Sequence, residues 1–179
     1  MPIYLEPLDV TSELETIGSV LIVSCMMCPP MSLAMQKKQP LIDVFKYGFR
    51  TKPYDDYVAS IREPLEKRGV RTGVYAKVAP WPFVCLWTEG QRKRLRKRAM
   101  EYEAVLVLGC NSALSTVEDV LKDTDCRVIP GMRMKGIVNA TTKVRLPFKV
   151  DLIMHPKKKR RGYKHKDEAA AKEEEQVGS

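Results

Sequence analysis

Cysteine is the residue type best able to do chemistry in this 179-residue chain, and four of the five cysteines follow predicted strands. Cys25 and Cys28 form a Cys-x-x-Cys pair after the apolar run 19–24. Cys85 follows a second strand and its proline-rich loop, and Cys110 closes a third strand at 104–110. Four gathered thiolates suit an iron–sulfur cluster or a tetrahedral zinc ion, both of which accept four cysteine ligands. The spacing does not choose between these two centres.

Strands that alternate with helices would position these cysteines. Apolar runs and two-residue periods predict strands at 19–24, 70–78, 104–110 and 126–130, and helical spacing predicts a broken helical segment at 32–48 and helices at 53–68 and 88–102. A capping box at Thr88 and Gln91 predicts the start of the helix at 88–102, and a second at Ser115 and Glu118 predicts the start of a further helix. This order predicts a three-layer α/β fold with a mainly parallel, flavodoxin-like sheet. Residues 144–152 alternate as a fifth strand, and Pro147 places it at a sheet edge.

The carboxyl ends of parallel strands meet at one edge of a sheet, where ligands bind. With the strand order 2-1-3, we expect Cys25, Cys28, Cys85 and Cys110 to meet there, whereas Cys126 opens its strand and belongs at the opposite edge. Helices that begin after Cys28 and Cys110 would favour the thiolate form. The alternatives are buried cysteines that act as small apolar residues, or thiols that carry a persulfide or reversible disulfide in sulfur transfer.

The Cys-x-x-Cys strand end and the strand 104–110 with its terminal Gly109-Cys110 resemble the small iron–sulfur (delta) subunit of methyl-viologen-reducing hydrogenase, a family associated with heterodisulfide reductase. The resemblance covers about residues 18 to 122. It implies that Cys25, Cys28 and Cys85, together with Cys110, ligate a 2Fe-2S or 4Fe-4S cluster. It also implies an electron-transfer or accessory subunit that works beside a larger flavin or iron–sulfur subunit.

The formal charge of +9 attracts anionic partners. One basic cluster lies on the predicted helix at 88–102, from Arg92 to Arg98, and a second lies in the tail. The first could dock an acidic redox partner. Nucleic-acid binding is the competing interpretation, but the chain has no aromatic RNA-binding strand or zinc finger.

A glycine-bounded basic loop is predicted after the fourth strand, with Gly131, Arg133 and Lys135 as candidates for binding the phosphate of a nucleotide or flavin. No acid–base pair or nucleophile constellation can be assigned. The sequence therefore favours a non-catalytic subunit of an oxidoreductase complex over an independent enzyme.

Length and composition predict one α/β domain over residues 1–155 and a flexible basic then acidic tail over 156–179. No apolar run approaches the length of a membrane span. The N-terminal residues lack the order of a secretory signal, which predicts a cytoplasmic protein with reduced cysteines.

Overall fold

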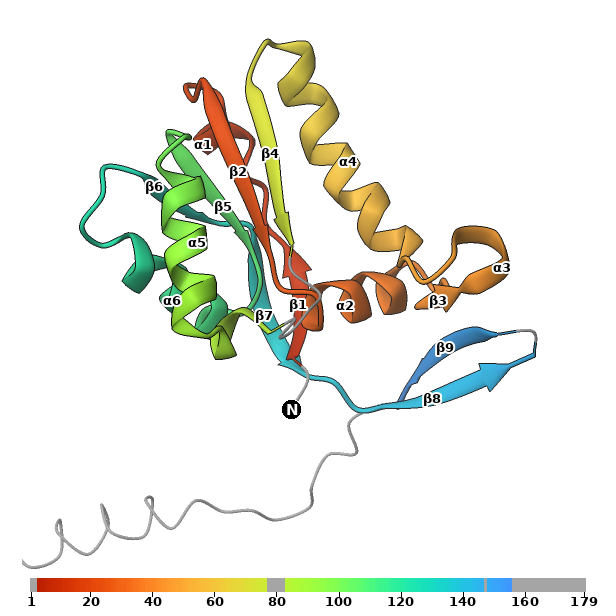
Figure 1. The fold of residues 1–179 in the computed structure, drawn as a ribbon. Helices are drawn as coiled ribbons and strands as arrows, with labels where there is room; N and C mark the ends of the chain where they lie inside the picture. The colour runs from red at the N-terminus through yellow and green to blue at the C-terminus, as the bar shows by residue number, and fades with distance from the viewer. Residues whose placement is uncertain (1–2, 77–82, 147, 156–179) are drawn as a thin grey trace, which may run out of the picture.

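A four-stranded parallel sheet forms the centre of the computed structural model, which describes residues 3–76, 83–146 and 148–155. Its strands are β2 (Ser19–Ser24), β4 (Arg71–Ala76), β5 (Ala104–Leu108) and β6 (Arg127–Pro130), and they lie in the order β4-β2-β5-β6. The protein is therefore a mixed α/β structure (Figure 1). The predicted central position of the first strand, between the second and the third, is confirmed.

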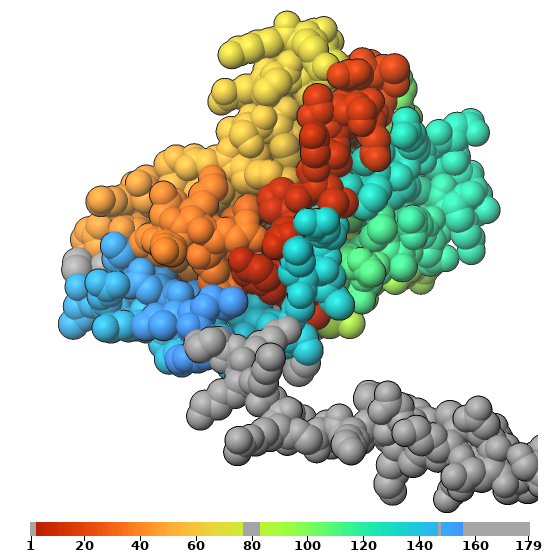
Figure 2. Space-filling model, turned by 180° about the vertical axis from the view of Figure 1, so that it is seen from behind, coloured from red at the N-terminus to blue at the C-terminus, as the bar shows by residue number. Residues whose placement is uncertain are grey.

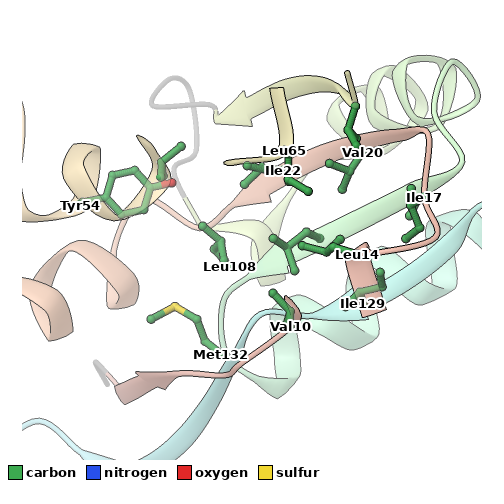
Figure 3. Close-up of a cluster of buried hydrophobic side chains, with 14 of the residues drawn as sticks. Val10, Leu14, Ile17, Val20, Ile22, Tyr54, Leu65, Leu108, Ile129 and Met132 are labelled. Carbon is green, nitrogen blue, oxygen red and sulfur yellow. The ribbon is translucent and has the colours of Figure 1, made fainter. Parts of the chain in front are cut away.

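Strands β2 and β5 are buried along their whole length, which explains why their sequences are continuously apolar. Successive side chains of β2 point to opposite faces of the sheet. Val20 and Ile22 belong to one buried cluster, part of which Figure 3 shows, and Leu21 and Val23 belong to another. Each face of the sheet thus has its own apolar core.

Six α-helices and one 3₁₀ helix connect the strands in the described part of the chain. They are α1 (Thr11–Leu14), α2 (Cys28–Gln36), α3 (Val44–Tyr47), α4 (Lys52–Lys67), the 3₁₀ helix η1 (Val84–Leu86), α5 (Glu89–Ala99) and α6 (Asn111–Leu121). Buried residues of α2 and α4 join the cluster of Val20, and those of α5 and α6 join the cluster of Leu21. None of the described helices is long and apolar enough to cross a bilayer.

Two of the helix starts test the capping predictions. The capping box of α5 is confirmed: the Thr88 side chain accepts from the Gln91 backbone, and the Gln91 side chain accepts from the Thr88 backbone. The predicted box at Ser115 is wrong, because α6 already begins at Asn111 with Cys110 as its N-cap. The turn after β5 therefore leads straight from the cysteine into the helix.

The C-terminal part of the described chain corrects a second prediction. Residues 144–152 are not one strand at the edge of the parallel sheet: they belong to β8 (Ala140–Arg145) and β9 (Lys149–Met154), an antiparallel pair that forms a separate sheet with β3 (Ile42–Asp43) in the order β3-β9-β8. The alternating pattern continues through the turn between the two strands, where Phe148 has a φ of +50°. Pro147, the residue used for the edge prediction, lies outside the described residues.

Residues 1–17, which the sequence pattern leaves unassigned, contribute β1 (Ile3–Pro7) and α1. Strand β1 pairs antiparallel with β7 (Met132–Ile137), and Figure 2 shows the two side by side from behind. Leu5 is completely buried, its N–H donates to Ser32 Oγ at 2.9 Å, and its carbonyl accepts from Gln36 Nε2 at 2.6 Å. These bonds hold β1 against α2.

The tail from residue 156 lies outside the described residues, so the domain boundary stays a prediction.

Candidate metal centre

Cys25 follows the last residue of β2 and is 2% exposed. Its backbone N–H donates to the carbonyl of Leu108 at 3.0 Å, which continues the pairing with β5 by one residue. A Cβ atom built on Gly109 would lie 3.6 Å from the Cβ of Cys25. Cys25 therefore lies beside the turn that carries Cys110.

Cys28 is the first residue of α2 and is 9% exposed. The N–H of Ile3 donates to its Sγ at 3.5 Å. This contact lowers the pKa of the thiol, but burial has the larger effect, and the pKa of Cys28 is raised. The net shift is therefore opposite to the expected thiolate at Cys28, because burial of the charged form outweighs the hydrogen bond from Ile3.

Cys85 lies in η1, which packs against α6, and Cys110 is the N-cap of that same helix. Both side chains are half-buried. Burial raises the pKa of Cys85, and the neighbouring Cys25 and Cys110 raise it further. Cys85 and Cys110 are therefore the members of the group that solvent can reach.

All four predicted ligands lie at the carboxyl edge of the parallel sheet. Cys25 lies beside the Gly109–Cys110 turn, and η1 with Cys85 packs against α6. In keeping with this, the charges of Cys25, Cys110 and Cys85 each raise the pKa of Cys28. Among the described residues, however, no three His, Cys, Asp or Glu side chains form a group that could hold a metal ion. The thiols share one edge of the sheet without forming a ready coordination site.

Cys126 lies elsewhere, as its position before β6 predicts. The next residue, Arg127, pairs with Ala104 at the start of β5, which places Cys126 at the amino edge of the sheet. There it lines a cavity of about 420 Å³ together with Tyr102 and Glu103. Cys126 is thus separated from the other four by the length of a strand.

The predicted basic loop at 131–136 is wrong, since residues from Met132 onward form strand β7. Arg133 and Lys135 lie on the same side of that strand, at 3.2 and 3.4 Å from the Glu6 carboxylate. A Cβ on the buried Gly131 would lie 2.7 Å from Leu108 Cδ2, so this glycine permits close packing. Anion binding by Gly131, Arg133 and Lys135 stays a prediction, which their pairing with Glu6 weakens.

Tyr54 is a residue of this edge that the sequence analysis missed. It comes from α4, and its hydroxyl donates to Ser24 Oγ, one residue before Cys25. Burial raises the pKa of Tyr54 to about 12. The sequence does show that Tyr54 shares one helical face with Val58 and Leu65, which predicts that its ring is buried. That spacing gives no indication of the hydrogen bond made by its hydroxyl.

The basic helix α5 is largely paired within the molecule. Arg92 forms an ion pair with Asp119 at 3.0 Å, Arg96 with Asp123 at 3.7 Å, and Arg98 with Glu101 at 2.5 Å. Lys93 likewise contacts Glu89. Carboxylates of α6 and of the segments after α5 and α6 therefore neutralise much of the positive charge that favoured α5 as a docking surface.

Comparisons of the chain with protein-family models, with curated proteins and with solved structures find no match. The resemblance to the hydrogenase delta subunit therefore stays a prediction. What the protein does has to be argued from the cysteine edge itself.

Proposed function

We propose that this protein is a metal-thiolate protein, with an iron–sulfur cluster as its centre and zinc as the alternative, and that Cys25, Cys28, Cys85 and Cys110 are the ligands. In this proposal it serves as an electron-transfer or accessory subunit of a redox complex like that of heterodisulfide reductase. We further infer a three-layer, flavodoxin-like arrangement and a cytoplasmic location. The separate apolar cores on the two sheet faces support the former.

One observation supports the proposal: Cys25 lies beside the turn that carries Cys110, Cys28 begins the helix after Cys25, and Cys85 lies in η1 against the helix that Cys110 caps. The donor type fits an iron–sulfur cluster or zinc, because both accept four cysteine thiolates. The four cysteines fit such a centre in ligand type and in location. Their sulfur atoms are not arranged as a metal site in the described residues. Binding would thus require the sulfur atoms to move closer together.

A bound cluster would supply one-electron transfer. The protein's part is to shield and orient the ligands. Cys25 and Cys28 are buried, which excludes water from that side of the centre. The Ile3 N–H, which already contacts Cys28 Sγ, would stabilise the negative sulfur of a ligand.

Sulfur transfer fits less well, because a nucleophilic cysteine needs a thiolate near neutral pH. Burial raises the pKa of Cys28, which keeps one thiol of the Cys25 and Cys28 pair protonated. Metal binding does not have this difficulty, since a cation displaces the thiol protons.

The argument for nucleic-acid binding through α5 is weaker than the sequence suggests, because arginines of α5 form ion pairs within the protein.

The test is anaerobic purification of the full chain, followed by iron, acid-labile sulfide and zinc analysis and a visible absorption spectrum. We expect bound iron with sulfide and a broad visible band. Changing Cys25, Cys28, Cys85 or Cys110 to Ser should each lower the metal content and the absorbance, because each change removes one proposed ligand.

Cys126→Ser is the matched control, since it removes a partly buried thiol at the other end of the sheet. It should keep the metal content of the unchanged protein. Far-UV circular dichroism would confirm that each variant folds. The proposal is wrong if the anaerobic protein takes up neither iron nor zinc, or if Cys126→Ser loses as much metal as the other four changes.

A further inference from the structure

The small sheet β3-β9-β8 exposes large apolar side chains that no other described element covers. None of its described residues is fully buried, in contrast to the completely buried β2 and β5. The three most exposed large apolar side chains of the described residues gather around it: Leu146 is 87% exposed, Phe49 86% and Phe45 70%. The neighbouring Phe148 is 62% exposed. We call these four residues the hairpin tip.

Pairing brings the two parts of the hairpin tip together. Asp43 of β3 pairs with Lys149 of β9, and the Val44 N–H donates to the Phe148 carbonyl at 3.2 Å. Helix α3 therefore begins beside the turn between β8 and β9. Figure 1 shows this hairpin and α3 at the periphery of the molecule, away from the parallel sheet. The hairpin tip is thus an outward projection of the molecule.

The charges around the hairpin tip are mainly positive. Residues 42–50 and 140–155 contain five basic side chains, Lys46, Arg50, Lys143, Arg145 and Lys149, and only two acidic ones, Asp43 and Asp151. The two carboxylates are 12% and 16% exposed and lie against Lys149 and Arg145, whose side chains are 37% and 57% exposed. Arg50 forms an ion pair with Asp55 of α4 at 3.0 Å, whereas Lys46 and Lys143 have no ion-pair partner in the described part of the chain. The charge presented to solvent is therefore cationic.

We propose that the hairpin tip and its basic residues dock the protein on an anionic lipid surface. Apolar side chains at the end of a projection can enter the boundary between headgroups and acyl chains, and each surrounding lysine or arginine gains from the negative surface potential. A second copy of the chain is a poor occupant because its hairpin tip carries the same positive charge. Nucleic acid would use the cations but would leave Leu146 without an apolar contact.

The test is cosedimentation of the full chain with lipid vesicles, which needs no bound metal and is independent of the proposed function. We expect binding to vesicles of phosphatidylcholine mixed with phosphatidylglycerol and little binding to phosphatidylcholine alone. The double change L146S/F148S should weaken binding at least about tenfold, since it removes the inserting side chains. The double change K46Q/K143Q should weaken it about fivefold for each lysine removed.

Controls of the same chemistry come from the other end of the molecule. Met100 is an exposed apolar residue and Lys97 an exposed cation of α5, so M100S and K97Q should bind vesicles as the unchanged protein does. The proposal is overturned if the protein ignores anionic vesicles or binds neutral ones equally well. It is also overturned if L146S/F148S binds normally while K46Q/K143Q loses affinity for both vesicles and a homopolymeric RNA, because phosphate charge alone would then explain the binding.

Discussion

At the scale of single residues, Tyr54 links stability to alkaline pH. The pKa of Tyr54 rises from an ordinary value of 10 to about 12 because its hydroxyl is buried, and that of the neighbouring Tyr57 also rises to about 12. The folded state thus holds these protons more tightly than the unfolded state. Their contribution to the free energy of unfolding is fully present below pH 10 and is lost as the pH rises toward 12.

Changing Tyr54 to Phe should therefore have opposite effects at neutral and alkaline pH. At pH 7 the variant should lose about 1 kcal/mol of unfolding free energy, because Ser24 Oγ loses its buried hydrogen-bond donor. Between pH 10 and 12 its stability should fall less steeply, since only one of the two tyrosines with a pKa near 12, Tyr57, remains. Urea unfolding measured across this range checks both effects. Equal slopes for the two proteins would show that Tyr54 does not titrate as argued.

At the scale of elements, the turn between β5 and α6 leaves no room for a side chain at Gly109. A Cβ atom there would lie 2.7 Å from the Cβ of Ala113 in the first turns of α6. We expect Gly109→Ala to destabilise the protein by about 1–3 kcal/mol, because α6 must move away from the sheet. Chemical denaturation would measure this loss.

Gly90→Ala is the matched control, since the nearest atom to its added Cβ is the flexible Arg94 side chain at 4.0 Å. Gly90 lies in α5, so alanine there should raise the stability by up to about 1 kcal/mol through helix propensity. If both alanine variants gained stability, the close packing at Gly109 would not be the constraint described above. A loss confined to Gly109→Ala would support it.

The sequence predicted best those elements whose residue pattern has one structural explanation. Strand β5 is apolar at every position and β2 at every position between its two terminal serines, and that pattern indicates a strand covered on both faces. The hairpin was not predictable in the same way, because its alternation continues through a turn that has no glycine. A glycine at each end similarly made residues 131–136 look like a loop, whereas Met132–Ile137 is strand β7.

For the candidate site, the sequence predicted the place and not the distances. Parallel strand order brings Cys25 and Cys110, which directly follow β2 and the β5 turn, to one edge of the sheet. The separation of their sulfur atoms depends on side-chain rotamers and on short segments such as η1, which no periodicity reveals. Ser24 with Tyr54 could not be predicted because their contact joins residues 30 positions apart.

At the scale of the whole molecule, burial is distributed unevenly between the sheets. The parallel sheet has a buried apolar core on each face, whereas β3, β8 and β9 contain no fully buried residue. Local opening costs least where few apolar contacts have to be broken. We therefore expect the amides of β8 and β9 to exchange hydrogen with solvent well before those of β2 and β5.

Native-state hydrogen exchange followed by mass spectrometry would measure this difference. Strand β6 is a useful internal comparison, because it is also an edge strand but pairs with the buried β5. Its protection should lie between that of β5 and that of β8. Protection of β8 and β9 equal to that of β5 would contradict the uneven stability argued here.

The pairing of β1 with β7 also affects how the protein is made. Residues 3–7 are translated long before their strand partner, which ends at Ile137. Leu5 is completely buried in the folded protein. For most of synthesis it lacks the neighbouring strand β7, so its side chain stays more exposed to solvent. The nascent chain thus carries the unpaired β1 until nearly the whole described fold has been translated.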